Sequence, residues 1–211
     1  MSLGPSTPAR IGKQARSLET RQKLVATAIE LLATHGYAAT TMARVAKAAG
    51  ISAGPRRYYF PNPADLFAAV VDEIHTTNQA NIAAAITDQG DLQSRLRAQF
   101  LASLSNVGSP QHMAMLELKM AIRGDPDLRR AIGPKIRAYE ERADNRFLRA
   151  VRETGLPEGE IVALRAIMAA TLRGLAIAAI ERDQTDIIAE VARLIPEMVT
   201  QRLRAGDQGQ T

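Results

Sequence analysis

The chain of 211 residues contains no cysteine and no tryptophan. Without cysteine it forms neither disulfides nor metal sites built on thiolates, and a reducing compartment suits it. Aromatic residues reach only 4% of the sequence. Because strands favour β-branched and aromatic residues, whereas Ala, Leu, Glu and Arg favour helices, this composition predicts a helical protein.

The sequence also lacks a long uninterrupted apolar run. Its most apolar stretch, residues 161–180, contains Arg165 and Arg173, whereas a membrane-spanning helix needs about 20 predominantly apolar residues. The first residues are small, polar and basic, without the apolar segment of a secretory signal. We therefore expect no membrane partner and a cytoplasmic location.

Positive charge is concentrated in the N-terminal part of the chain. Residues 1–60 contain nine Lys and Arg against two Glu, a net charge of +7, and the other residues contain 18 Lys and Arg against 20 acidic residues, a net charge of −2. A basic segment beside a nearly neutral body predicts a polyanionic partner such as nucleic acid. A solvated basic surface without a partner is the alternative.

Apolar residues recur at helical spacing along almost the whole chain, without the alternation of strands. We predict an all-α fold of about nine helices packed as a bundle. The first long helix is predicted over residues 17–34, and the helices after residue 60 over 62–87, 91–104, 110–124, 126–154, 158–182 and 185–203. Gly133-Pro134 and Pro196 are expected to break or kink the helices that contain them.

Residues 40–60 have the spacing of a helix-turn-helix. A short helix after Thr41 is followed by a tight turn in which Gly50 permits the backbone conformation and Ile51 fills a small core. Ser52 then caps a third helix, whose exposed N–H groups can bind a phosphate, and Gly54 lets a DNA backbone approach. The motif predicts DNA binding.

In these residues the chain resembles the tetracycline-repressor (TetR) family of transcription regulators. The matching positions are Thr20-Arg21, Leu24, Ala28, Leu31-Leu32, Gly36-Tyr37, Thr40-Thr41, Val45-Ala46, Ala49-Gly50-Ile51-Ser52, Gly54, Tyr59-Phe60-Pro61 and Leu66. The resemblance implies a repressor that binds a palindromic operator as a dimer, with its third helix in the major groove. It also implies that the last two helices pair between subunits and that a small effector moves the DNA-binding domains apart.

The resemblance implies, position by position, a set of residues that contact DNA. We add Arg56 to this set as a phosphate contact. The alternative for Arg56 is a side chain that is solvated and contacts no DNA. The set is Thr40, Thr41, Arg44, Ser52, Gly54, Arg56, Arg57, Tyr58 and Tyr59. Guanidinium and phenol groups suit guanine edges and phosphate oxygens. The family usually has an aliphatic and then an aromatic residue at Arg56-Arg57, and often a Lys at Pro63. These departures bear on the operator sequence.

For the effector, the resemblance implies a cavity among the fourth to eighth helices. Flexible Met side chains suit such a cavity, although a Met-rich helix also fits an ordinary core. We predict a lining of His75, Phe100, Leu104, His112, Met113, Leu116, Met120, Phe147, Met168 and Leu172. This lining predicts a largely apolar small molecule, with the two histidines as orienting groups. No cofactor or metal is expected, because the histidines lack metal-ligand spacing.

The last two predicted helices carry more apolar surface than one subunit can cover. Residues 158–182 are rich in Ala and Gly, which lets helices pack closely, and residues 185–203 add several Ile, Val, Leu and Met side chains. An exposed patch of this size is a liability in a monomer. We therefore expect a homodimer formed through about residues 158–203, with a purely intramolecular core as the alternative.

The predicted organisation has four parts: a flexible basic arm (1–16), a helix-turn-helix domain (17–61), a helical ligand-binding and dimerisation domain (62–205) and a disordered tail (206–211).

Two other functions are alternatives to a transcription regulator: an enzyme and a helical adaptor without DNA binding. An enzyme is not expected, because the sequence has no glycine-rich phosphate loop, no histidine pair at metal spacing and no recognisable Ser/His/Asp arrangement. A helical adaptor would account for neither the basic segment nor the glycine-containing turn.

Overall fold

The structure is a computed structural model that describes residues 8–52, 58–85, 91–181 and 184–207. Within these residues every regular element is a helix, which confirms the predicted all-α fold. The helices are α1 (Pro8–Ala39), α2 (Met42–Ala48), α4 (Pro63–Ala85), α5 (Leu92–Leu104), α6 (Pro110–Ala121), α7 (Pro126–Ala150), α8 (Glu158–Glu181) and α9 (Thr185–Asp207), with a short 3-10 turn, η1 (Arg152–Thr154). Of the predicted third helix, Tyr58 and Tyr59 fall within the described residues, and both are helical.

Most helices begin where the sequence predicts, because a polar side chain caps them. Thr41, Asp91, Ser109 and Asp125 each accept a hydrogen bond from a backbone N–H in the first turn of α2, α5, α6 and α7. Asn62 does the same for α4, at 2.9 Å. Each cap satisfies a donor that the start of a helix leaves unpaired. The local sequence alone therefore determines these boundaries.

α1 and α9 are longer than the sequence predicts, whereas α7 ends at Ala150, four residues before its predicted end. α1 begins at Pro8 rather than near residue 17, so residues 8–16 are helical instead of belonging to a flexible arm. α7 and α9 continue through Pro134 and Pro196. A proline removes one helical N–H, and in α7 the carbonyl that loses its donor belongs to Arg130, which is exposed. Water can satisfy that carbonyl, so the proline does not end the helix.

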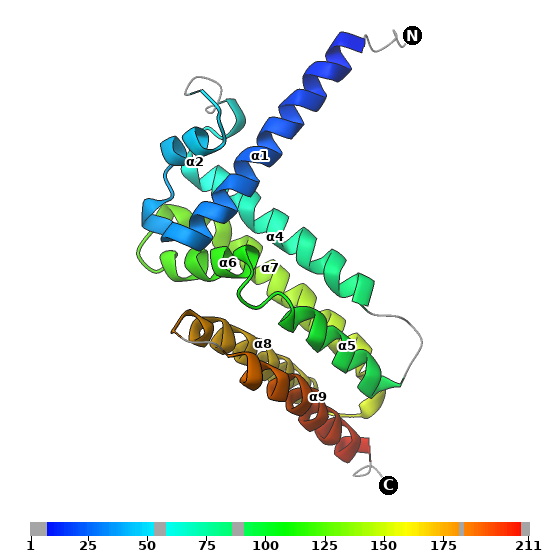
Figure 1. Ribbon diagram of the computed structural model, residues 1–211. Coiled ribbons are helices and arrows are strands. Elements are labelled where there is room, and N and C mark those ends of the chain that lie inside the picture. Colours follow the sequence, from blue (N-terminus) through cyan, green and yellow to red (C-terminus); the bar gives the residue numbers. More distant parts are fainter. Residues whose placement is uncertain (1–7, 53–57, 86–90, 182–183, 208–211) are drawn as a thin grey trace, which may run out of the picture.

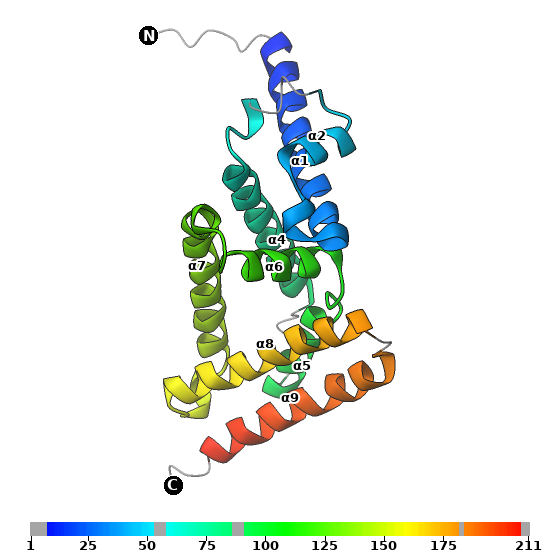
Figure 2. The same ribbon diagram turned by 90° about the vertical axis from the view of Figure 1, so that its left-hand side faces the viewer.

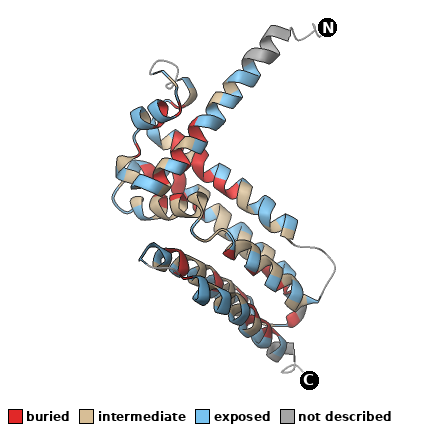
Figure 3. Ribbon diagram, in the orientation of Figure 1, coloured by how far each residue is buried: buried red, intermediate tan, exposed pale blue. Residues whose placement is uncertain are grey.

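The helices pack around two cores. The first core lies between α1, α2, α4, α6 and the first half of α7, and the second lies between α5, the second half of α7, α8 and α9. Figures 1 and 2 show α1 and α2 at one end of the molecule and the antiparallel α8–α9 pair at the other. The buried residues of the first core gather where α1 meets α4 and α6 (Figure 3).

A group of polar contacts fixes the end of α1 to α6. Gly36 interrupts α1 with a φ of 75°, which L side chains rarely adopt. Tyr37 donates its backbone N–H to Glu117 Oε2 at 3.0 Å and its hydroxyl to Asp125 Oδ2 at 2.6 Å. The Tyr37 ring packs against Phe67 of α4, with ring centroids 5.2 Å apart. We call Gly36, Tyr37, Glu117 and Asp125 the Tyr37 joint.

The Tyr37 joint predicts the effect of removing one hydroxyl. Burial and the neighbouring Asp125 hold the pKa of Tyr37 well above its usual value, so the hydroxyl remains a protonated donor near neutral pH. Tyr37→Phe keeps the ring but loses this bond, and we expect the free energy of unfolding to fall by about 1 kcal/mol in urea denaturation. Tyr58→Phe is the control, because Tyr58 is 77% exposed. Equal unfolding midpoints for both variants would contradict this role of the joint.

Candidate nucleic-acid interface and ligand cavity

The turn after α2 has the geometry that the helix-turn-helix spacing predicts. Gly50 has a φ of 67°, and the N–H of Ile51 donates to the carbonyl of Ala46 at 2.9 Å. Ala46 and Ala49 are buried, and Ile51 packs partly buried against the first core. Small side chains on α2 thus let the turn close tightly, and the turn directs the chain into the segment that precedes Tyr58.

Five of the predicted DNA contacts lie at or near one surface. Thr41, Arg44 and Ser52 are exposed on α2 and after its turn, Tyr58 is exposed, and Tyr59 is half-buried. The two tyrosine rings meet edge to face, with centroids 5.3 Å apart. Tyr59 also packs against the first core, whereas Tyr58 projects into solvent.

Thr40 is a correction to the predicted DNA contacts. It is only 4% exposed, and its hydroxyl donates to the carbonyl of Gly36 at 2.7 Å. Its side chain is therefore used to close the end of α1 and is not free to contact DNA. Gly54, Arg56 and Arg57, the other predicted contacts, lie outside the described residues.

Exposed cations surround this surface. Arg16, Arg21 and Lys23 are exposed on α1, and Arg44 and Lys47 are exposed on α2. Figure 1 shows that the first part of α1 projects away from the body of the molecule, on the side that carries α2. The basic charge seen in the sequence is thus gathered at one end of the fold, as binding to a phosphate backbone requires.

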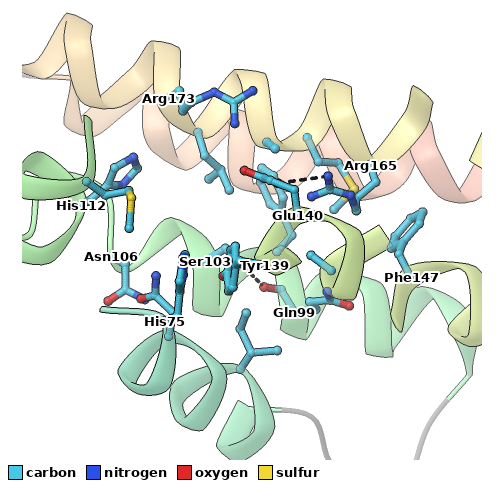
Figure 4. Close-up of a pocket in the computed structure, with 18 of the residues that line it drawn as sticks. His75, Gln99, Ser103, Asn106, His112, Tyr139, Glu140, Phe147, Arg165 and Arg173 are labelled. Atoms are coloured by element: carbon cyan, nitrogen blue, oxygen red, sulfur yellow. Dashed lines mark hydrogen bonds and ion pairs between the residues drawn. The ribbon is translucent and has the colours of Figure 1, made fainter. Parts of the chain in front are cut away.

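A cavity of about 200 Å³ lies between α4, α5, α6, α7 and α8 (Figure 4). Seven residues predicted to line it do so: His75, Phe100, His112, Leu116, Phe147, Met168 and Leu172. The hydrophobic spacing of the sequence thus located the cavity and much of its apolar wall. Phe100 and Phe147 are fully buried there and belong to the second core.

Three predicted lining residues are not in the cavity wall. Leu104 is buried in the second core, Met113 is half-buried away from the cavity, and Met120 is 61% exposed. On α6 the cavity instead receives Met115, a methionine that the prediction omitted. Apolar side chains occur around most of α6, so the sequence did not reveal how this helix is rotated about its axis.

The cavity wall is more polar than the sequence suggested. The lining side chains with polar groups that the prediction missed are Asn78, Gln99, Ser103, Asn106, Gln111, Lys119, Tyr139, Glu140, Arg146, Arg165 and Arg173. One signal was present, because Arg165 and Arg173 interrupt an otherwise apolar helix. Eight residues apart, they fall within about a quarter turn of each other on α8. The expectation of a largely apolar lining is therefore corrected to a mixed one.

His75 is buried in the cavity wall. It is 7% exposed, and among the described residues neither ring nitrogen has a hydrogen-bond partner. Its ring stacks on Tyr139, with centroids 3.6 Å apart and planes at 14°. Burial, and then the charges of Lys119 and Arg142, lower the pKa of His75 to about 4. The imidazole is therefore neutral near pH 7 and presents one unused donor and one unused acceptor.

The charged groups of the cavity are only partly paired. Glu140 binds Lys119 at 2.9 Å and Arg165 at 3.2 Å, and Arg165 also binds Asp144. Burial opposes ionisation of Glu140, but Lys119 and Arg165 outweigh it and lower its pKa, so it is a carboxylate near pH 7. Among the described residues, no group of three or more His, Asp or Glu is arranged to hold a metal.

α6 has two functional faces. Gln111, His112, Met115, Leu116 and Lys119 face the cavity at helical spacing. The opposite side contributes buried Ala114 and Leu118 to the first core and Glu117 to the Tyr37 joint. A single helix of 12 residues therefore contacts both the cavity and the helix that supports the helix-turn-helix.

α8 and α9 present a wide apolar surface to solvent. Exposed side chains on it are Ile167, Ile177, Ile180, Ile187, Leu194 and Met198. α8 is also the one helix among the described residues that is long and apolar enough to cross a membrane by length and composition, and only 22% of its most apolar window is buried. Its Arg165 and Arg173 nonetheless line the cavity inside the protein.

Comparison with known proteins agrees with this architecture. A profile described as "Bacterial regulatory proteins, tetR family" matches residues 24–70. The HTH-type transcriptional regulator CymR of Pseudomonas putida is 26% identical over 177 residues, which cover 81% of this chain and 84% of CymR. The probable acrEF/envCD operon repressor of Escherichia coli (strain K12) is 28% identical over 109 residues, which cover 50% of this chain and 49% of the repressor.

The fold is also that of a solved regulator. A transcriptional regulator from Rhodococcus sp. Rha1 superposes with a TM-score of 0.73 at 20% identity, over 86% of this chain and 96% of the regulator. The profile match covers the second half of α1, all of α2 and the start of α4, and it includes the turn after α2. Residues 24–70 therefore match the TetR family of bacterial regulatory proteins, and the chain is similar over most of its length to an HTH-type transcriptional regulator.

Proposed function

We propose that the protein is a dimeric repressor that binds a palindromic operator and is released from it by a small molecule in the cavity. The observation that carries this proposal is the position of α6, which lines the cavity with one face and holds α1 through Glu117 with the other. We keep the division into a helix-turn-helix domain (17–61) and a ligand-binding and dimerisation domain (62–205). Operator binding also implies a cytoplasmic location.

The DNA-binding surface would use the exposed groups around α2. Thr41 and Ser52 offer hydroxyls, Arg44 a guanidinium and Tyr58 a phenol. The predicted contacts Gly54, Arg56 and Arg57 remain part of the proposal, because they lie between Ser52 and Tyr58 in the chain. The exposed cations of α1 and α2 would add phosphate contacts, which supply affinity without reading sequence.

A second copy of the chain would cover the exposed apolar surface of α8 and α9. On α8, Ile167, Ala170, Gly174 and Ile177 are exposed at helical spacing and form a stripe along one side. Small residues within such a stripe let two helices approach closely, and a two-fold axis would bury the same stripe of both subunits. The surface would then be covered by protein rather than by lipid.

Release would follow from a shift of α6. A ligand that fits one conformation of the cavity better than the other shifts the population between them. Glu117 of α6 accepts the backbone N–H of Tyr37 at 3.0 Å, and both helices pack into the first core, so a movement of α6 would be passed to the end of α1. A rotation or translation of α6 would therefore change the orientation of α1 and, in a dimer, the separation of the two DNA-binding surfaces.

Selection of bound sequences from random DNA tests the proposed function. We expect an inverted repeat whose half-sites lie one helical turn, or a small multiple of it, apart, because two DNA-binding domains related by a two-fold axis read symmetric half-sites. The expected affinity falls steeply with salt concentration. Enrichment of no sequence, or of a single unpaired half-site, would contradict a dimeric operator-binding protein.

The exposed guanidinium of α2 provides a prediction about affinity. Arg44→Ala should weaken operator binding and reduce the salt dependence by about one phosphate contact per subunit. Fluorescence anisotropy at several salt concentrations measures both quantities. Arg149→Ala, an exposed Arg on α7, is the matched control and should bind the operator as the wild type does. If the two variants behave alike, Arg44 does not contact DNA.

The apolar surface provides a prediction about assembly. Ile177→Glu and Leu194→Glu put a charge at exposed apolar positions of α8 and α9, and we expect monomers in analytical ultracentrifugation with loss of operator binding. Ala189→Glu adds the same charge at an exposed position of α9 on another side of the helix and should leave a dimer. Wild-type protein that sediments as a monomer at micromolar concentration would refute the proposed interface.

A further inference from the structure

The cavity has a surplus of positive charge. Its lining contains Lys119, Arg146, Arg165 and Arg173, against a single carboxylate, Glu140. Asp144, outside the lining, forms a second ion pair with Arg165. Two acidic groups thus balance Lys119 and Arg165, and two guanidinium groups are left without a counter-charge.

These two guanidinium groups have no partner within the described parts of the chain. Neither Arg146 nor Arg173 forms an ion pair or a side-chain hydrogen bond there, and both are only partly exposed. Desolvated charge is costly unless it is paired. An anion in the cavity would remove that cost, whereas a cation would add to it.

The wall presents different side chains at its two sides, and the Arg165–Glu140 ion pair lies near Phe147. In Figure 4, Arg173 and His112 lie together at one side of the cavity, with Asn106 below them, and Phe147 lies at the other side. Phe147 belongs to the second core together with Phe100. A ligand that spans the cavity would therefore meet a cationic, hydrogen-bonding end and an aromatic end.

Buried His75 is a second and independent sign of a ligand. Within the described part of the chain, both of its ring nitrogens lack a hydrogen-bond partner although the side chain is 7% exposed. Folded proteins rarely leave buried polar atoms unpaired. A neutral imidazole can donate to a carboxylate or hydroxyl oxygen and accept from a hydroxyl, so a ligand with oxygen atoms would satisfy it.

We propose that the effector is a small amphipathic carboxylate, whose anionic group binds the Arg173 guanidinium and whose apolar body lies against Phe100 and Phe147. This inference rests on the proposed function, because it names the chemical class of the molecule that occupies the same cavity. A volume of about 200 Å³ holds roughly seven waters, each of which occupies about 30 Å³ in the liquid. It therefore suits a monocarboxylic acid with a single ring or a medium alkyl chain.

The test compares ligands that differ only in charge. Calorimetric titration of the full-length protein uses the straight-chain acids from hexanoate to decanoate and the phenylalkanoates from phenylacetate to phenylbutyrate, each beside the alcohol and the primary amine with the same carbon skeleton. We expect at least one carboxylate to bind about ten-fold or more tightly than its alcohol and its amine, the difference expected from one charge-assisted contact.

Variants of Arg173 locate the anionic group. Arg173→Met and Arg173→Gln remove the charge with different side chains, and circular dichroism reports whether each folds. We expect either folded variant to bind the carboxylate about ten-fold or more weakly and to bind the alcohol unchanged. Arg149→Met, on the exposed side of α7, is the control and should keep the wild-type affinity for both.

Three results would overturn the proposal: an alcohol or amine that matches its acid for every acid that binds, Arg173 variants with unchanged affinity for the carboxylate, or binding of none of the panel. Operator selection and sedimentation are independent of all three. If they yield a palindrome and a dimer while the acids fail, the carboxylate class is wrong and the proposed repressor stands. If they fail as well, the proposed function is wrong.

Discussion

The hold of α6 on Tyr37 is the contact on which the rest of the structure depends. The backbone N–H and the hydroxyl of Tyr37 bind Glu117 and Asp125, which lie within α6 and directly before α7. A Cβ at the adjacent Gly36 would lie 3.0 Å from Glu117 Oε2, so the glycine favours the close approach of this carboxylate. α1 therefore cannot be repositioned without α6, and α1 supports the helix-turn-helix. The interior of a protein is close-packed, so such a contact transmits movement instead of absorbing it.

The contact between α6 and Tyr37 lies in the first of the two cores. The first core surrounds the joint, and the second core holds the α8–α9 pair and the apolar end of the cavity. α7 contributes to both, and the cavity lies between them. A ligand at this boundary can change how the cores fit together while each stays intact. Packed elements with two discrete arrangements are the usual basis of such switches. If α8 and α9 are held by a second subunit, the change in fit between the cores would displace the opposite end of each subunit, which carries α1 and α2.

Local patterns predicted most of the fold, because caps such as Asp91 and Asn62 act within one helical turn. The helix-turn-helix was equally accessible, since it depends on fixed offsets along the chain. The cavity was predicted only in part. Helical spacing identified inward positions such as Phe147, but the choice between Met113 and Met115 depends on how α6 packs. The polar lining also escaped prediction, because its ion pairs join residues that are far apart in the sequence.

We propose that a ligand in the cavity moves the two DNA-binding surfaces of a dimer. The chain has no cysteine, so Lys47→Cys, at an exposed position of α2, provides one site for a spin label in each subunit. Pulsed electron resonance then measures the distance between the labels in the dimer, with the cavity empty and with it saturated by a ligand confirmed calorimetrically to bind there. We expect the distance distribution to shift when the ligand saturates the cavity. An unchanged distribution with the cavity filled would contradict this proposal.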